Sequence, residues 1–163
     1  MENNPLLDIS RISGRRGSKS TGRFLTKIKQ MIQLKGNEMT FNFDREFQSM
    51  MQVNDLNTVI LLGHLNPDGD AAGSVMGLAH YIKVNYPQYK VLPYLADTLD
   101  KGPKKQVKLD KVFNPFEKPD VKEKYAVIVC DTAVLARMIG REYYEGAAAS
   151  MVIDHHASNE GYG

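Results

Sequence analysis

Acidic and imidazole side chains gather in three short segments, each of which follows an apolar run of the sequence. The first segment holds His64, Asp68 and Asp70, the second holds Asp131, and the third is Asp154-His155-His156. In an open α/β sheet, ligands bind outside the carboxyl ends of the strands, so residues that follow different strands can share one site. Carboxylate oxygens and imidazole nitrogens without thiolates suit manganese or magnesium. The pattern therefore predicts a site for divalent cations.

Each segment also has an ordinary structural explanation. Residues 66–69 read Asn-Pro-Asp-Gly, which is turn chemistry, and Asp70 could cap the helix that follows. Four carboxylates on one rim would nevertheless repel one another unless cations compensated them, which favours a metal site. A calcium loop of the EF-hand type is excluded, because the fifth and twelfth positions counted from Asp68 are Ala72 and Ala79.

Short apolar runs alternate with segments of helical period in the rest of the sequence. The expected strands are residues 58–63, 89–96, 125–130 and 150–153, and the expected helices are residues 43–54, 71–86 and 134–144. Residues 101–124 form a connector with eight lysines and four acids, which we interpret as a solvated face with one short strand near 107–113. This order predicts an α/β fold with an open parallel sheet flanked by helices.

Together the three segments resemble the first three signature motifs of the DHH phosphoesterases. The first motif reads His64-x-x-Pro67-Asp68-Gly69-Asp70-Ala71-x-Gly73-Ser74, the second reads Asp131-Thr132-Ala133, and the third is Asp154-His155-His156 with Asn159 close behind. The resemblance covers residues 58–163 and is specific, because three motifs occur in order at the expected strand ends. It implies a Rossmann-like DHH domain that hydrolyses phosphate esters with two divalent cations.

The resemblance also implies which residues bind the cations. A first ion would be held by His64, Asp68 and Asp131, and a second by Asp70, Asp131 and His155, so that Asp131 bridges the pair. The expected ions are Mn²⁺, with Mg²⁺ as the alternative. Two such cations lower the pKa of a shared water, and the resulting hydroxide would attack the phosphorus.

Other residues are expected to orient or contact the substrate. Asp154 would orient an imidazole, and His156 would face the substrate phosphate, so that both join Asp131 and His155 as catalytic residues. The resemblance adds Asn159 to the substrate contacts. The glycines of the first motif, Gly69 and Gly73, would let the backbone approach the phosphate closely.

With glycine between Asp68 and Asp70, the first motif resembles that of the nanoRNase and 3'-phosphoadenosine-5'-phosphate phosphatase branch of the family. The predicted substrates are therefore short oligoribonucleotides, 3'-phosphoadenosine-5'-phosphate or both. Three other DHH activities remain open, namely cyclic dinucleotide phosphodiesterase, exopolyphosphatase and pyrophosphatase. An inactive nucleotide-binding fragment also remains open, because the family's fourth motif and its DHHA1-type domain are expected beyond Gly163.

A homodimer is compatible with the sequence, and residues 150–153 are expected to form an exposed sheet edge.

Charge divides the chain into two parts. Residues 1–38 carry eight Lys and Arg against three acids, whereas the remainder carries thirteen bases against sixteen acids. We interpret residues 1–38 as a basic, disordered leader, with a nucleic-acid-binding arm as the alternative, and residues 39–163 as a partial DHH domain. The single cysteine, Cys130, excludes an internal disulfide and favours the cytoplasm. The apolar runs are too short to span a membrane.

Overall fold

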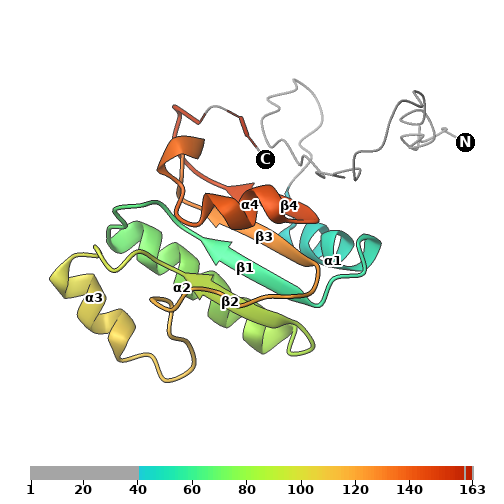
Figure 1. Ribbon diagram of the computed structural model, residues 1–163, viewed down its shortest axis with the longest axis horizontal. Helices are drawn as coiled ribbons and strands as arrows, with labels where there is room; N and C mark the ends of the chain where they lie inside the picture. Colours follow the sequence, from blue (N-terminus) through green and yellow to red (C-terminus); the bar gives the residue numbers. More distant parts are fainter. Residues whose placement is uncertain (1–40, 160, 163) are drawn as a thin grey trace, which may run out of the picture.

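The computed structural model describes residues 41–159 and 161–162, so the predicted leader lies outside the described residues. Along the chain the elements are α1 (Phe43–Val53), β1 (Thr58–Leu62), α2 (Gly69–Asn85), β2 (Lys90–Tyr94), α3 (Lys101–Lys108), β3 (Tyr125–Cys130), the 3₁₀ helix η2 (Leu135–Arg137), α4 (Arg141–Gly146) and β4 (Ala149–Ile153). Figure 1 shows their arrangement around a central sheet. No described helix is both long and apolar enough to cross a bilayer.

The four strands form a parallel sheet in the order β2-β1-β3-β4. Val59 of β1 lies opposite Val91 of β2 on one side and opposite Ala126 of β3 on the other. Every residue of β1 is buried, as is every residue of β3 after Tyr125. Strands buried on both faces do not alternate between apolar and polar residues, which explains the continuous apolar runs. The predicted α/β fold with an open parallel sheet is confirmed.

Helices cover both faces of the sheet. Phe47 and Met51 of α1 belong to one core cluster with Ile128 of β3, and α2 adds its buried apolar residues to the same cluster. On the opposite face, Met138 and Tyr144 from the segment after β3 belong to a second core cluster with residues of β1 and β3. Figure 1 shows α4 near β3 and β4 and α3 beside α2. This layered packing holds the carboxyl ends of the parallel strands along one rim.

The amino end of α2 is fixed by Asp68. Its Oδ1 accepts hydrogen bonds from the backbone N–H groups of Asp70, at 2.9 Å, and Ala71, at 3.0 Å. Asp68 is therefore the N-cap, and α2 begins two residues before the predicted start. Because the same carboxylate ends the loop after β1, the helix cap holds a predicted metal ligand at the rim of the sheet.

The strand predicted near residues 107–113 is wrong. Residues Lys101–Lys108 form α3, and a turn follows in which Asp110 Oδ1 accepts hydrogen bonds from the N–H groups of Val112 and Phe113. Pro103 lies in the first turn of α3, where its missing N–H has no helical partner to lose. Val107 is buried against the core, so its apolar character reflects one face of a helix and not a strand.

The continuous helix predicted over residues 134–144 is also wrong. Only η2 and α4 are helical, and Met138 between them has an extended backbone. Gly140 adopts the left-handed conformation with φ of 61°, which glycine enters without a steric penalty. The extended residue pairs with the loop after β1 through an antiparallel bridge between His64 and Met138. Tertiary pairing thus replaces the middle of the predicted helix.

Candidate metal centre

The candidate site lies on the rim formed by the carboxyl ends of β1, β3 and β4. His64 lies in the loop after β1, Asp131 directly follows β3, and Asp154-His155-His156 directly follows β4. Asp68 and Asp70 join them from the amino end of α2. Segments that are far apart in the sequence therefore meet because the strands run parallel.

The first predicted metal group is compact, and two of its three residues are buried. His64, Asp68 and Asp131 each offer a ligand atom, and these atoms all lie within 4.8 Å of one another. His64 and Asp131 are buried, yet His64 Nδ1 and Asp131 Oδ1 have no hydrogen-bond partner. Buried polar atoms are nearly always hydrogen-bonded, so two such atoms that face one carboxylate cluster need another partner. A divalent cation with oxygen and imidazole ligands fits this group.

The pKa of Asp68 is held below its ordinary value. The backbone N–H of Ala71 has the largest effect and outweighs the opposing effect of burial, and the N–H of Asp70 contributes as well. A carboxylate whose ionised form is stabilised by hydrogen bonds stays charged at neutral pH. One oxygen, Oδ1, makes both bonds, so Oδ2 is the atom of Asp68 that remains available as a ligand.

Asp131 has an unusual backbone conformation for a residue other than glycine. Its φ is 50°, and its N–H donates to the carbonyl oxygen of Ile153 at 3.0 Å. Asp and Asn enter this left-handed region more readily than other residues that carry a side chain. A strained conformation that persists at a binding site must be held by its surroundings, here by the neighbouring strand β4.

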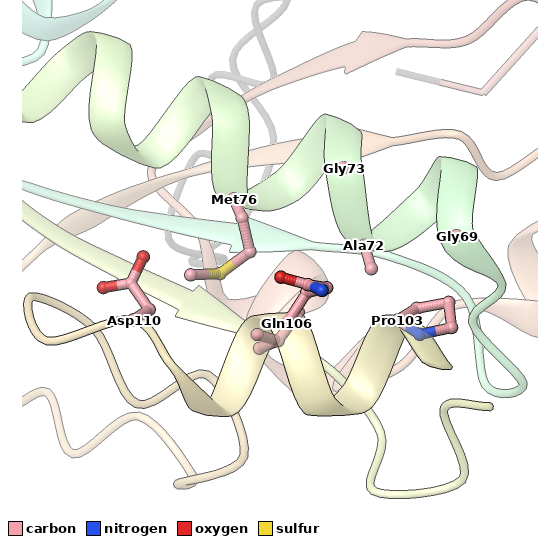
Figure 2. A pocket seen from close by; sticks show the side chains of 8 residues that line it. Gly69, Ala72, Gly73, Met76, Pro103, Gln106 and Asp110 are labelled. Atoms are coloured by element: carbon pink, nitrogen blue, oxygen red, sulfur yellow. The ribbon is translucent and has the colours of Figure 1, made fainter. Parts of the chain in front are cut away.

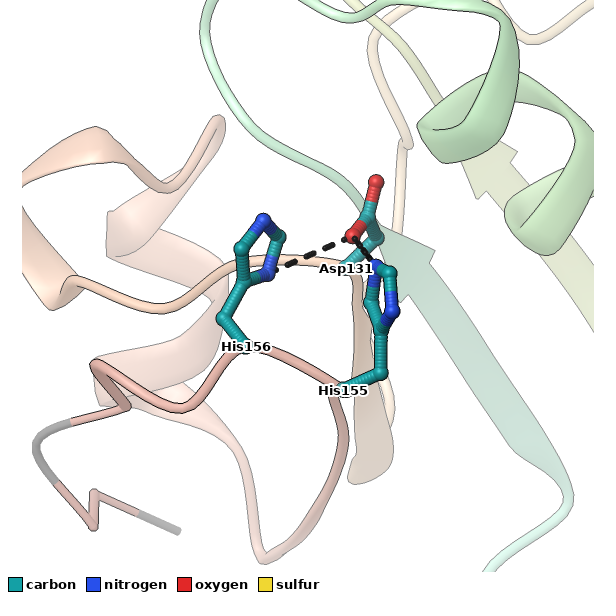
Figure 3. Close-up of side chains that lie close together, drawn as sticks. All are labelled: Asp131, His155 and His156. Atoms are coloured by element: carbon teal, nitrogen blue, oxygen red, sulfur yellow. Dashed lines mark ion pairs between the residues drawn. The ribbon is translucent and has the colours of Figure 1, made fainter.

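The second predicted metal group is more open. His155 Nε2 lies 3.3 Å from Asp131 Oδ1 and 3.5 Å from Asp70 Oδ2, and the side chains of His155 and Asp70 are 72% and 65% exposed. Asp131, His155 and His156 also form a group with ligand atoms within 4.8 Å (Figure 3). Neither imidazole donates a hydrogen bond to Asp131 Oδ1, despite these short distances. His155 thus lies near both of its predicted co-ligands.

Asp154 contacts an imidazole, as predicted, and that imidazole belongs to His156. Its side chain is 2% exposed, and Oδ1 lies 2.7 Å from His156 Nδ1. Burial works to raise the pKa of Asp154, but hydrogen bonds from Asn159 and His156 outweigh it and lower the pKa. The same carboxylate raises the pKa of His156. Because an ionised carboxylate only accepts hydrogen bonds, Nδ1 donates, and Nε2 is the nitrogen left for a substrate or an ion.

The side-chain amide of Asn159 is already used within its loop. Asn159 Nδ2 donates to Asp154 Oδ2 at 2.6 Å, and its Oδ1 accepts from the N–H of Gly161 at 2.8 Å. In this arrangement the residue braces Asp154, which in turn positions His156. Direct contact between Asn159 and a substrate remains a prediction.

The two predicted substrate-binding glycines line a groove between α2 and α3. Gly69 and Gly73 share this cavity of about 480 Å³ with Met76, Pro103 and other residues of the two helices (Figure 2). A Cβ added at Gly73 would have no atom within 4 Å, and one added at Gly69 would lie 3.5 Å from Pro103. Packing among the described residues therefore does not require glycine at either position, and contact with a phosphate remains a prediction.

Sequence reasoning missed one charged residue at the site. A cavity of about 210 Å³ at the first metal group is lined by His64, Asp68, Asp131 and His156, and also by Arg137. The sequence placed Arg137 inside a continuous helix and gave no reason to direct it toward the metal ligands. Its position four residues after Ala133 of the second motif was the only available signal.

The fold agrees with the comparison to known protein families. Residues 58–162 match the family described as "DHH family, N-terminal domain". The match covers more than half of the chain, all four strands and every predicted site residue. The chain belongs to the DHH family.

Two curated proteins show more specific similarity. The chain is 36% identical over 106 residues to the "Bifunctional oligoribonuclease and PAP phosphatase NrnA" of Bacillus subtilis (strain 168), covering 65% of this chain and 31% of that protein. It is 32% identical over 116 residues to the "Probable bifunctional oligoribonuclease and PAP phosphatase NrnA" of Streptococcus mutans serotype c (strain ATCC 700610 / UA159), covering 70% of this chain and 34% of that protein. The aligned segments thus span about a third of each relative.

Proposed function

We propose that the chain is the metal-binding domain of a phosphoesterase that hydrolyses short oligoribonucleotides, 3'-phosphoadenosine-5'-phosphate or both. Membership of the DHH family supports the reaction class, and the names of the two curated relatives support the substrates. Two divalent cations, with Mn²⁺ preferred over Mg²⁺, are part of the proposal. Their expected ligands are His64, Asp68, Asp70, Asp131 and His155.

The observation that carries the proposal is the unsatisfied polar chemistry of the first metal group. His64 Nδ1 and Asp131 Oδ1 are buried without hydrogen bonds, beside the carboxylate of Asp68. Leaving a buried polar atom unpaired costs about 1–3 kcal/mol, and the cost is higher for a charge. Binding of a cation would recover this cost, whereas a purely structural role for these residues offers no such compensation.

The chain's own residues divide the work of hydrolysis. Asp131 is the expected bridge, since it belongs to the cluster with His64 and Asp68 and also lies 3.3 Å from His155 Nε2 through Oδ1. His156 lines the cavity at the first metal group and is held through Nδ1 by Asp154, so in its protonated form Nε2 could donate a hydrogen bond to a phosphate. When bound, the two cations would supply Lewis-acid activation of the attacking water and of the phosphate.

Manganese binding and hydrolysis test the proposal together. Calorimetric titration of the 163-residue chain should reveal two sites, with the group of His64, Asp68 and Asp131 binding more tightly than the more exposed group of Asp70, Asp131 and His155. Hydrolysis of a short RNA and of 3'-phosphoadenosine-5'-phosphate should then be measured under the same conditions.

Competing substrates separate this proposal from the other activities of the family. A cyclic dinucleotide, polyphosphate and pyrophosphate should be poorer substrates than short RNA under the same manganese concentration. Faster hydrolysis of any of these three would replace the proposed substrate class. The absence of manganese binding by the chain would refute the metal-dependent mechanism as a whole.

A further inference from the structure

The backbone holds Arg137 beside the loop that carries His64. The N–H of Leu65 donates to the carbonyl oxygen of Arg137 at 2.7 Å, and the N–H of Ile139 donates to the carbonyl oxygen of Gly63 at 3.1 Å. Between these two bonds lies the antiparallel bridge of His64 with Met138. These backbone hydrogen bonds therefore fix the position of Arg137 at the rim that carries the candidate site.

Arg137 is the one arginine of the described residues that lacks an acidic partner. Arg45 pairs with Glu46 at 2.7 Å, and Arg141 pairs with Glu145 at 2.9 Å. No carboxylate lies within 4.0 Å of the Arg137 guanidinium in residues 41–159 and 161–162, although Asp68 and Asp131 line the same cavity. Its side chain is exposed, so the guanidinium stays solvated and free to bind an anion.

The chemistry of the cavity indicates which anion Arg137 would bind. Without the proposed cations, the carboxylates of Asp68 and Asp131 would repel an anion. With the cations bound, the charge of these carboxylates is compensated. A phosphate drawn to those cations would bring further negative oxygens to the cavity wall, where Arg137 lies. Arginine binds phosphate through two parallel N–H···O bonds, which lysine cannot reproduce.

We propose that Arg137 binds the phosphate group of the substrate opposite the metal ions, through hydrogen bonds from its guanidinium to oxygens that the metals do not hold. The assignment rests on the proposed function and deepens it, because it adds a cationic phosphate ligand from this domain.

Binding of adenosine 5'-monophosphate provides the test without requiring turnover. Affinity is measured by calorimetry in saturating manganese for the unaltered chain, for Arg137→Gln and Arg137→Lys, and for the matched control Arg141→Gln. The control removes an exposed arginine only four positions away, which lies outside the cavity. Arg137→Gln should weaken binding by about 10- to 100-fold, because hydrogen bonds between charged groups are lost.

The two remaining variants refine the expected result. Arg137→Lys should fall between the unaltered chain and Arg137→Gln, since lysine keeps the charge and loses the paired geometry. Arg141→Gln should bind adenosine 5'-monophosphate as the unaltered chain does. Manganese stoichiometry and affinity, together with the circular dichroism spectrum, should be preserved in Arg137→Gln.

Several outcomes would overturn the assignment. It fails if Arg137→Gln retains the affinity of the unaltered chain, or if Arg137→Gln and Arg141→Gln lose affinity equally. It also fails if Arg137→Gln loses manganese, or if the unaltered chain binds no nucleotide in manganese. If nucleotide binding depends on Arg137 while neither RNA nor 3'-phosphoadenosine-5'-phosphate is hydrolysed, the Arg137 assignment stands and the proposed function fails.

Discussion

Two carboxylates from other elements lie near the two ends of α2 in opposite situations. At the carboxyl end, Asp44 Oδ1 of α1 accepts hydrogen bonds from the hydroxyl groups of Tyr81, at 2.7 Å, and Tyr86, at 2.6 Å. At the amino end, Asp131 Oδ1 is buried and accepts none. Asp44 therefore has hydrogen-bond partners within the fold, whereas Asp131 Oδ1 has none among the described residues, as the proposed cation site requires.

This difference separates carboxylates that serve structure from those that serve binding. Acidic residues near a helix end are common, and neither their number nor their spacing distinguishes the two groups. Burial without a hydrogen-bond partner distinguishes the two groups, because an unpaired buried polar group costs free energy that a stable fold otherwise avoids. The predictions below test whether the contrast between Asp131 and Asp44 holds in solution.

The largest expected effect is that of Asp131→Asn on metal-dependent hydrolysis. Loss of the charge that both cations are proposed to share should lower the rate on the order of 10³-fold or more, since groups that act as a unit fail together. The free energy of unfolding without metal should stay the same or rise, because an uncompensated buried charge is removed. Activity assays in manganese and urea unfolding in chelator measure the two effects.

A matched control for this variant is Asp131→Ala. Alanine also removes the metal ligand, but it adopts a φ of 50° less readily than asparagine. The free energy of unfolding of Asp131→Ala should therefore be lower than that of Asp131→Asn by about 1–2 kcal/mol. Substantial hydrolysis by Asp131→Asn in manganese would rule out Asp131 as the bridge between the ions.

A smaller loss is expected for Asp154→Asn. Asp154 holds Nδ1 of His156, and such outer hydrogen bonds to site imidazoles typically contribute 10- to 100-fold to metal affinity or activity, so a loss of about this size is expected. The kcat for short RNA and the manganese affinity should be measured together. The pKa of His156 should fall toward its ordinary value, as seen by NMR titration in chelator, because Asp154 is the main cause of its elevation. An unchanged titration would show that the observed pair does not persist in solution.

At the opposite end of α2, Asp44→Asn should affect stability and leave metal binding unchanged. The pKa of Asp44 is lowered by its bonds from Tyr81 and Tyr86, so its contribution is present above 3.8 and is lost as pH falls through the folded value. The variant should therefore unfold at lower urea concentration at neutral pH and converge with the unaltered chain in acid. A decrease in manganese affinity would break the proposed division between the two ends.

The hydrogen bond from Tyr81 to Asp44 should also make the free energy of unfolding depend on pH in the alkaline range. This hydrogen bond raises the pKa of the Tyr81 phenol from 10.0 to about 12. Between these values the unfolded chain loses the proton and the folded chain keeps it, so the free energy of unfolding should fall as pH rises through this window. Urea unfolding at several alkaline pH values measures this slope, which should be shallower in Tyr81→Phe. Equal slopes would contradict the contact.

The smallest effect is expected for Gly73→Ala in α2. A Cβ at this position meets no atom within 4 Å, and alanine in a helix is more favourable than glycine by about 0.5–1 kcal/mol. The variant should therefore be slightly more stable in thermal unfolding. If Gly73 allows close approach of a phosphate, affinity for adenosine 5'-monophosphate should fall despite the gain in stability. Unchanged affinity would remove Gly73 from the predicted substrate contacts.

The sequence by itself determined the sheet and the identity of the chemical groups at the site. Continuous apolar runs such as Tyr125–Cys130 are typical of strands buried on both faces, and parallel strands bring their carboxyl ends to one rim. The three motifs could therefore be placed together before any coordinates were known. Family membership followed from the same residues, because their order and spacing are local properties of the chain.

Only the tertiary structure decided which polar atoms remain unpaired and which positively charged side chain lines the cavity. The apolar period of residues 134–144 predicted a helix, but a bridge from Met138 to His64 interrupts it and brings Arg137 to the metal rim. Such a bridge joins residues far apart in the sequence, and local periodicity carries no information about it. The hydrogen bonds of Asp44 and the unpaired oxygen of Asp131 likewise depend on neighbours from other elements, which packing alone selects.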